Sequence, residues 1–160
     1  EPDGAVAWRS EEETAALVSL MDDLNHARLG AALTARERRV GTAFRRMRAG
    51  RQRAEARFDG LAGCLRTPRG GSSRQFVLVA EAGALRSRLL TGREAARLMG
   101  LPDSYRLPAR ANAALHLSGD GVAVPVVRHV AAEILEPLLT GRAAPPERFQ
   151  IHAQGLSSAP

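Results

Sequence analysis

Residues 86–108 read RSRLLTGREAARLMGLPDSYRLP, and their periodicity changes from that of a strand to that of a helix at Thr91. Thr91 and Glu94 have the spacing of a capping box, in which each side chain bonds the other residue's backbone N–H at a helix start. Gly100 then supplies a common helix stop, and the prolines beyond it cannot continue the helix. The stretch therefore predicts a strand, a capped helix and a turn in immediate succession.

Upstream of this stretch, the sequence has the alternation expected of a small antiparallel sheet. Residues 39–48 and 53–58 alternate around the turn letters AGRQ, which predicts a hairpin whose arginines lie on its outer side. Residues 74–81, RQFVLVAE, read as a buried strand, and residues 85–90 pair back onto it after a turn at AGA. The middle of the chain is therefore predicted to be an antiparallel sheet with arginine-bearing loops.

Helices are predicted in the sequence before and after the sheet region. Residues 10–29 read as one acidic helix, capped by Ser10 and Glu13, with an apolar face made by Leu17, Leu20, Met21 and Leu24. In the helix that follows Thr91, the residues expected to face inward are Ala95, Leu98 and Met99. Residues 110–119 predict a second helix. Residues 119–139 predict a turn and a third helix, with Pro125 in its first turn and an apolar stripe along it.

The charge distribution points to a polyanionic partner. All 23 basic residues are arginine, and residues 28–75 hold thirteen of them against three acidic residues, whereas residues 1–27 hold seven acidic residues and one arginine. Arginine forks suit phosphate groups, so a basic middle region favours nucleic acid. A GC-rich genome would also favour arginine over lysine, and a solvated basic face without a partner is the alternative.

Composition excludes several other classes of protein. The 160 residues are 44% hydrophobic and 25% charged, which is typical of a globular domain, and no apolar run approaches the ~20 residues that span a membrane. The single cysteine excludes a disulfide within the chain and a multi-cysteine zinc site. The four histidines have no spacing that suits metal binding or a catalytic triad, so no metal is predicted. The expected location is the cytoplasm.

Two motifs near the C-terminus resemble the end of the bacterial DNA (cytosine-5)-methyltransferases. The ninth motif of that family reads Arg-x-Leu-Thr-Pro-Arg-Glu, followed by a helix and a Pro-Asp turn. The residues that match it are Arg88, Leu90, Thr91, Arg93, Glu94, Pro102, Asp103 and Tyr105, and Gly92 stands where proline is usual. The tenth motif, Gly-Asn-x-Val, is matched by Gly119, Gly121 and Val122, with Asp120 in the asparagine place. The resemblance covers roughly residues 35–139.

The resemblance implies an organisation in four parts and an α+β fold. Residues 1–34 would form a linker and an acidic helix, and residues 35–90 a small antiparallel target recognition region. Residues 91–139 would carry the two motifs on three helices, the last of which packs toward a catalytic domain that this sequence lacks. Residues 140–160 are predicted to be a disordered tail.

The stretch CLRTPRGGSSRQ at residues 64–75 occupies the place of the family's recognition loop, with Cys64-Leu65 where Thr-Leu is usual. Arginine suits the paired acceptors of guanine, and hydroxyl groups and backbone amides suit phosphate oxygens. The implied DNA contacts are Arg66, Thr67, Arg69, Gly70, Gly71, Ser72, Ser73, Arg74 and Gln75, with Arg45, Arg46 and Arg48 as phosphate contacts. A solvated surface loop is the alternative for any single arginine.

The resemblance also implies a cofactor and a division of labour. The partners would be double-stranded DNA and S-adenosylmethionine, with Asp120, Gly121 and Val122 completing the cofactor site; Arg88, Thr91, Arg93 and Glu94 would be structural. The family's glycine-rich cofactor loop, Pro-Cys nucleophile and Glu-Asn-Val motif are absent from these 160 residues. Cys64 follows Gly63 and is expected to be a packing residue, so no catalytic residue is predicted.

We therefore expect target recognition and completion of the cofactor site for methyl transfer to cytosine C5. The catalytic machinery would lie on a missing N-terminal domain or a separate subunit, and this chain alone would be inactive. The alternatives are a stand-alone DNA-binding module without catalysis and an inactive remnant.

Overall fold

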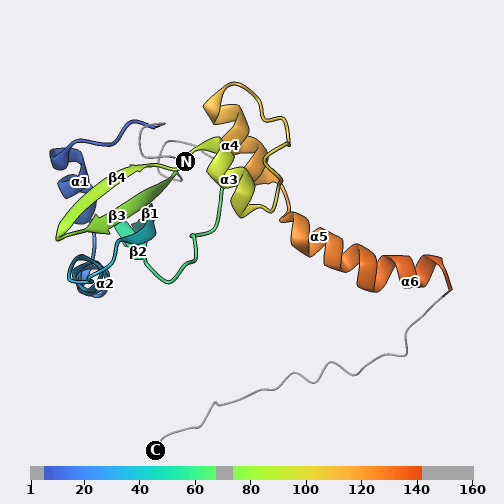
Figure 1. The fold of residues 1–160 in the computed structure, drawn as a ribbon, viewed down its shortest axis with the longest axis horizontal. Helices are drawn as coiled ribbons and strands as arrows, with labels where there is room; N and C mark the ends of the chain where they lie inside the picture. The colour runs from blue at the N-terminus through green and yellow to red at the C-terminus, as the bar shows by residue number, and fades with distance from the viewer. Residues whose placement is uncertain (1–5, 68–73, 142–160) are drawn as a thin grey trace, which may run out of the picture. The chain divides into compact units, whose positions relative to one another are not determined.

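The computed structural model describes residues 6–67 and 74–141 of the chain. It contains a four-stranded antiparallel sheet and several helices (Figure 1), which confirms the predicted α+β class. The chain divides into two compact units, Glu1–Val124 and Pro125–Pro160, which are described separately. The predicted contacts Arg69, Gly70, Gly71, Ser72 and Ser73 and the predicted tail from residue 142 onward lie outside the described residues.

The sheet consists of two hairpins joined through their central strands. Its strands are β1 (Arg39–Arg48), β2 (Arg51–Arg57), β3 (Gln75–Glu81) and β4 (Ala84–Leu89), in the spatial order β2-β1-β3-β4. Both hairpins agree with the sequence prediction, and every neighbouring pair is antiparallel. β3 is buried on both faces from Gln75 to Ala80, because helices and loops cover the two sides of the sheet.

Both hairpins turn through the same Ala-Gly dipeptide. Ala49 and Gly50 have φ values of 48° and 72°, and Ala82 and Gly83 have φ values of 49° and 79°. Two successive residues with positive φ form the mirror-image turn that matches the twist of a hairpin. Glycine adopts this conformation readily, but alanine is strained in it by about 1 kcal/mol because its Cβ approaches the carbonyl oxygen.

Replacing Ala82 by asparagine is therefore expected to stabilise the protein. Asparagine tolerates positive φ and is preferred at this position of the turn, so the free energy of unfolding should rise by roughly 0.5–1 kcal/mol. Urea denaturation measures the change. The matched control is Ala84→Asn, two residues away in the strand, where asparagine has no such advantage and should leave stability unchanged or lower it.

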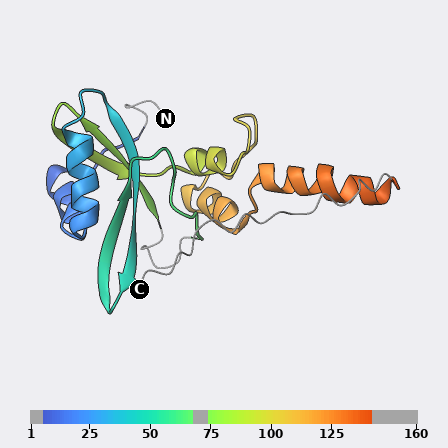
Figure 2. The ribbon, with the colours of Figure 1, turned by 90° about the horizontal axis from the view of Figure 1, so that it is seen from below.

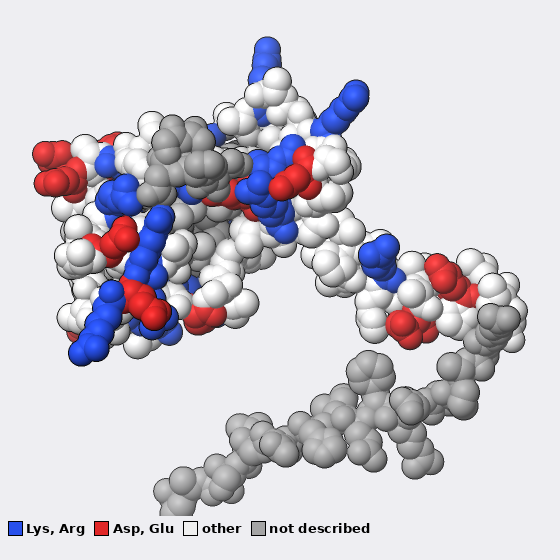
Figure 3. Space-filling view, viewed as in Figure 1, with Lys and Arg blue, Asp and Glu red and all other residues white. Residues whose placement is uncertain are grey.

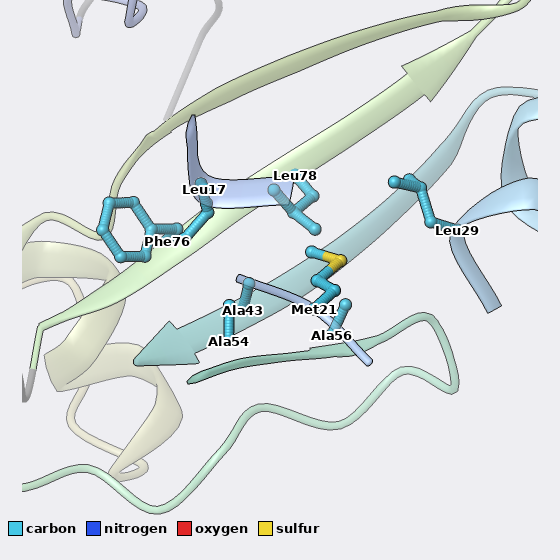
Figure 4. Packing of buried hydrophobic residues seen from close by; sticks show 8 residues of the cluster. All are labelled: Leu17, Met21, Leu29, Ala43, Ala54, Ala56, Phe76 and Leu78. Atoms are coloured by element: carbon cyan, nitrogen blue, oxygen red, sulfur yellow. The ribbon is translucent and has the colours of Figure 1, made fainter. Parts of the chain in front are cut away.

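Two helices cover one face of the sheet and form its main core. They are α1 (Glu11–Val18) and α2 (Asp23–Leu33). The buried residues that meet there are Leu17, Met21, Leu29, Ala43, Ala54, Ala56, Phe76 and Leu78 (Figure 4). Small alanines on β1 and β2 let the helices approach the sheet closely, and Phe76 and Leu78 of β3 fill the centre.

The prediction of one continuous helix over residues 10–29 was wrong. The capping box of Ser10 and Glu13 is confirmed, but α1 ends at Val18 and a second cap follows, in which Asp22 accepts from the Asn25 backbone N–H at 3.0 Å. Between the helices Met21 forms an isolated bridge with Ala54 and enters the core. The break gives each helix its own angle to the sheet, and it leaves Leu24, which was expected on the apolar face, 60% exposed.

The same break protects the outer edge of β2. The Ala54 backbone N–H donates to the Leu20 carbonyl at 2.9 Å, and the Ala56 backbone N–H donates to the Asn25 side chain at 2.9 Å. Asn25 is buried, so its amide replaces a neighbouring strand. These bonds satisfy edge groups that would otherwise be open to pairing with another chain.

The opposite face of the sheet packs against the helices that carry the two C-terminal motifs. α3 (Gly92–Leu98) begins with the predicted capping box, and α4 (Ala111–Asp120) follows after the proline-rich turn. Their second core contains Val77, Val79, Leu90 and Ala95, with Trp8, Leu65 and Leu115 packed against it. Ala95 is buried as expected, but Leu98 is 49% exposed and Ala96 is buried in its place, so α3 is rotated from the predicted orientation.

The close packing of α3 against α4 accounts for the glycine at position 92. A Cβ atom added there would lie 2.6 Å from the Cβ of Ala114, so the glycine allows α3 and α4 to approach each other closely. The substitution of glycine for the usual proline of the ninth motif therefore has a packing reason.

The second unit is a helix with a π-helical turn in its middle. Its described residues form α5 (Val124–Val130), whose first residue belongs to the first unit, the π-helical turn η1 (Ala131–Leu135) and α6 (Glu136–Leu139). Pro137 lacks the N–H for a bond four residues back, and its ring would crowd that carbonyl. The Glu136 N–H instead donates to Ala131, five residues back, which widens the helix and accommodates the proline.

Among the described residues no helix combines the length and the apolar character needed to cross a bilayer.

Candidate functional site

The described ends of the segment 64–75 are fastened to α4. Thr67 donates its hydroxyl hydrogen to the Asp120 carboxylate, and Arg74 donates to the side-chain oxygen of Asn112. Leu65 packs against the second core. We call residues 63–67, 74 and 75 the loop root. It lies on the face of the sheet opposite α1 and α2.

The backbone of the loop root meets α4 at Gly119. A Cβ atom added to Gly119 would lie 2.5 Å from the Arg66 carbonyl carbon and 2.5 Å from the Thr67 nitrogen. These partners are backbone atoms, which cannot move aside as a side-chain tip can. The contact therefore requires glycine, and it brings the predicted recognition segment against the start of the stretch that resembles the tenth motif.

Within the loop root, the Gln75 side chain holds the backbone of residues 63 and 64 through hydrogen bonds. The Gly63 backbone N–H donates to its side-chain oxygen at 3.1 Å, and its side-chain nitrogen donates to the carbonyls of Gly63 at 2.6 Å and Cys64 at 3.1 Å. Gln75 is 3% exposed, so this predicted DNA contact has its amide engaged within the chain. Arg66, by contrast, is exposed at the surface of the loop root.

The three arginines predicted as phosphate contacts do not lie on one face of β1. Arg45 points to the helix-covered side, where its guanidinium carbon lies 5.4 Å from the centre of the Phe76 ring. Arg46 and Arg48 point to the side of the loop root, since side chains alternate along a strand. Both contact Glu55: Arg46 forms an ion pair with it, and Arg48 Nε lies 3.9 Å from its Oε1. Figure 3 shows that basic side chains over the sheet unit are interspersed with acidic ones.

The ninth-motif residues form a buried bracket between β4 and α3. Arg88 donates to both carboxylate oxygens of Glu94, at 2.8 and 2.6 Å, and the Thr91 backbone N–H donates to the same carboxylate at 3.0 Å. The two side chains of the ion pair are only 6% and 14% exposed. Burial alone would raise the pKa of Glu94, but the hydrogen bonds from Arg88 and Thr91 outweigh it and lower the pKa to about 2. The carboxylate therefore stays charged at neutral pH.

Two further arginines fasten the turn that follows α3. Arg93 donates to the carbonyls of Pro102 at 3.4 Å and Tyr105 at 2.9 Å. Arg97 forms a fork with Asp103, with distances of 2.7 and 3.1 Å. Through its hydrogen bonds Arg97 lowers the pKa of Asp103. The matched residues of the ninth motif are thus occupied with each other and with the backbone, which agrees with a structural role.

The residues predicted to complete a cofactor site lie where α4 ends. Asp120 is the last residue of α4, Gly121 caps it in an extended conformation, and Val122 is 67% exposed. Beside them is a pocket of about 240 Å³ whose lining includes Met99, Tyr105 and Leu117. This volume is below the ~300–1,000 Å³ of a typical small-molecule site. The apolar lining suits part of a nucleoside-containing ligand, so these residues fit as one wall of a larger site.

Sequence reasoning missed a larger pocket under α3. It has a volume of about 570 Å³, and its lining includes Trp8, Val40, Leu61, Val77 and Leu98. Trp8 lies in the predicted linker, yet its ring stacks against the guanidinium of Arg86 at 4.4 Å. The chain's only tryptophan was the available signal, because a lone indole before a helix usually marks a packed segment.

The described structure also bears on Cys64 and on possible metal ligands. Cys64 is exposed, so the expectation that it is a packing residue was wrong. Within residues 6–67 and 74–141, no three His, Cys, Asp or Glu side chains come together in a way that could hold a metal ion.

A comparison with protein-family models matches residues 24–136 to the C-5 cytosine-specific DNA methylase family, and this range is more than half of the chain. Comparisons with curated proteins and with solved structures found no match.

Proposed function

Because the chain belongs to the C-5 cytosine-specific DNA methylase family, we propose that it recognises the target DNA and completes the cofactor site of a bacterial DNA (cytosine-5)-methyltransferase. The transferred methyl group would come from S-adenosylmethionine, the methyl donor used in this family. The nucleophile that attacks cytosine would lie on another segment or chain, since these 160 residues contain no Pro-Cys pair. The chain alone would then bind DNA without methylating it.

The observation that carries this proposal is the meeting of two predicted sites at the end of α4. Thr67 belongs to the predicted DNA-binding segment and Asp120 to the predicted cofactor segment, and their side chains are hydrogen-bonded across 53 positions of sequence. Gly119 lies directly against the backbone between Arg66 and Thr67. A methyltransferase has to bring the target base and the methyl donor to one place, and the contact between the two segments predicted to bind them supports this proposal.

In this proposal the predicted contact residues have different roles in binding DNA and the cofactor. Arg66 and Arg74 at the loop root would contact base edges or phosphates, and Thr67 would hold the root while its backbone faces the DNA. Arg46 and Arg48 would contact phosphates. Asp120, Gly121 and Val122 would hold S-adenosylmethionine as one wall of its site, the rest of which would be supplied from outside the chain.

The helix of the second unit supports the need for a partner. None of the described residues of α5, η1 or α6 is buried, and the apolar stripe includes Val130 and Ile134, which are 38% and 50% exposed. Apolar side chains gain free energy when they leave water, so a continuous stripe of this kind favours an interface.

The proposal is tested by complementation. The chain is mixed with a catalytic fragment that carries the nucleophile and cofactor motifs, and methyl transfer from labelled S-adenosylmethionine to duplex DNA is measured. We expect methylation in the mixture and none with either component alone. The double variant Val130→Glu/Ile134→Glu should abolish methylation in the mixture but leave DNA binding by the chain unchanged, because it disrupts only the apolar stripe.

The matched control adds the same two charges to the other side of this helix, as His129→Glu/Ala132→Glu, and should retain methylation. An inactive mixture combined with sequence-specific duplex binding by the chain alone would identify a binding module instead. Absence of both activities would identify an inactive remnant.

A further inference from the structure

The tip of the β1–β2 hairpin carries four arginines on one face. Arg46 is paired directly with Arg53, and Arg48 with Arg51, across the two strands. Residues two positions apart point to the same side of a strand, so all four side chains lie on one face of the ribbon. The opposite face at this level has Met47 paired with Gln52 and no charge.

These arginines have little counter-charge. Within the described residues Glu55 is the acidic side chain that pairs with them, and it serves both Arg46 and Arg48. No ion pair of Arg51 or Arg53 is found among the described residues. Hydrogen bonds from Asn25 are the main cause that lowers the pKa of Asp22. The positive charge of Arg53 also lowers it, by electrostatic attraction without a hydrogen bond. Four guanidinium groups therefore share one carboxylate at close range.

This arrangement is unfavourable for the isolated hairpin. Like charges directly opposite each other on a ribbon repel and destabilise it. The hairpin extends beyond the helices that cover the sheet (Figure 2), and Met47 near its tip is 62% exposed, so core packing does not offset the repulsion there.

The arginine face is continuous with the loop root. A Cβ atom on Gly63 would lie 2.8 Å from Cδ1 of Phe44, so the loop root packs on the face of β1 to which Phe44 points. Phe44, Arg46 and Arg48 follow one another on that face at two-residue intervals. Arg48 lies four positions after Phe44, which places the hairpin tip about 14 Å farther along the strand than the loop root.

We propose that the β1–β2 hairpin tip is a second DNA contact, which binds the phosphate backbone independently of sequence through Arg46, Arg48, Arg51 and Arg53. Phosphate oxygens along a duplex provide the closely spaced negative charge that these guanidinium groups lack within the chain. The contact rests on the proposed function and deepens it: the loop root selects the sequence, and the hairpin holds the flanking backbone on the same side of the sheet.

The experiment compares the double variant Arg48→Gln/Arg51→Gln with the whole wild-type chain on duplexes of random sequence and of selected target sequence. We expect affinity to fall roughly 10- to 60-fold at 0.1 M salt, because each lost phosphate contact removes about 0.9 from the slope of log K against log salt. The loss should be equal on both duplexes. The thermal midpoint should stay the same or rise, because a repulsive pair has been removed.

Two further variants make the result specific. Arg36→Gln/Arg39→Gln removes the same charge from exposed positions at the other end of β1, and it should change affinity and salt slope far less. Arg48→Lys/Arg51→Lys keeps the charge and should retain most of the affinity, since lysine serves as a point charge for phosphate.

The outcomes separate this inference from the proposed function. If the wild-type chain binds duplex DNA and Arg48→Gln/Arg51→Gln binds with the same affinity and salt slope, the hairpin contact is wrong, including the phosphate contact of Arg48, and target recognition by the loop root stands. A loss confined to the target duplex would also overturn it, because it would mark base contacts. If the wild-type chain binds no duplex even at low salt, the proposed function fails and the hairpin contact fails with it.

Discussion

Replacing Glu94 by glutamine is expected to lower the free energy of unfolding by about 3 kcal/mol at neutral pH. The substitution keeps the shape of the side chain but removes its charge, so the buried guanidinium of Arg88, which is 6% exposed, loses the carboxylate that accepts two of its hydrogen bonds. It also weakens the cap of α3, where the carboxylate accepts from the Thr91 backbone N–H. Chemical denaturation followed by circular dichroism measures the change.

The chain contains a matched control for this effect. Glu13 occupies the same capping-box position in α1, with hydrogen bonds of 3.1 Å in both directions to Ser10. Its side chain is 57% exposed, and its nearest guanidinium, that of Arg9, is 3.8 Å away. Glu13→Gln should therefore cost less than about 1 kcal/mol, because exposed ion pairs and caps contribute little. An equal loss of stability at the two positions would contradict the stabilising role assigned to the buried pair of Arg88 and Glu94.

The contribution of Glu94 also has a defined pH dependence. Its pKa is lowered from the ordinary value of 4.5 to about 2, so the folded state favours the carboxylate. Stabilisation by a group with a lowered pKa is complete above the unfolded pKa and is lost as the pH falls through the folded one. The stability difference between wild type and Glu94→Gln should therefore be about 1–2 kcal/mol smaller at pH 3 than at pH 7. Exposed carboxylates titrate in both proteins, so the difference isolates Glu94.

The features predicted correctly from the sequence are those governed by neighbouring residues. The alternation of β1 and β2, the apolar run of β3 and the Ala-Gly turns have local causes, and the structure contains both hairpins. The capping boxes at Ser10 and Thr91 are also local, because they join residues three positions apart. The break between α1 and α2 depends instead on Met21 entering a core built from distant strands, which periodicity alone does not report.

The candidate site was predictable only in part, for the same reason. Strand alternation separates Arg45 from Arg46 and Arg48 and could have been applied to the sequence directly. Segments about fifty positions apart are joined by the bond between Thr67 and Asp120 and by the contact at Gly119. Such contacts cannot be predicted from a local sequence pattern. Gln75 has the residue type of a DNA contact, but its burial and its bonds to Gly63 are decided by the fold.

Replacing Gly119 by valine is expected to dislodge the loop root and to lower both stability and DNA affinity. The added Cβ would lie 2.5 Å from backbone atoms of Arg66 and Thr67, and an ordinary contact distance requires a shift of almost 1 Å. Overpacking of this kind costs about 3 kcal/mol. Because the shift also breaks the bond from Thr67 to Asp120, affinity for a target duplex should fall at least tenfold while the salt slope is largely retained, since the hairpin arginines are untouched.

Gly30 in α2 is the appropriate comparison, because it is also a helical glycine but a Cβ added there meets nothing within 4 Å. Gly30→Val should change stability by no more than about 0.5 kcal/mol, and Gly30→Ala should increase it by up to about 1 kcal/mol through helix propensity alone. Gly119→Ala gains the same helix propensity, but its Cβ still meets the loop backbone. This substitution should therefore lower stability, whereas Gly30→Ala should raise it. Stabilisation by alanine at both positions, with unchanged duplex binding, would mean that the loop root does not depend on α4. The link between the two predicted sites would then have no physical basis.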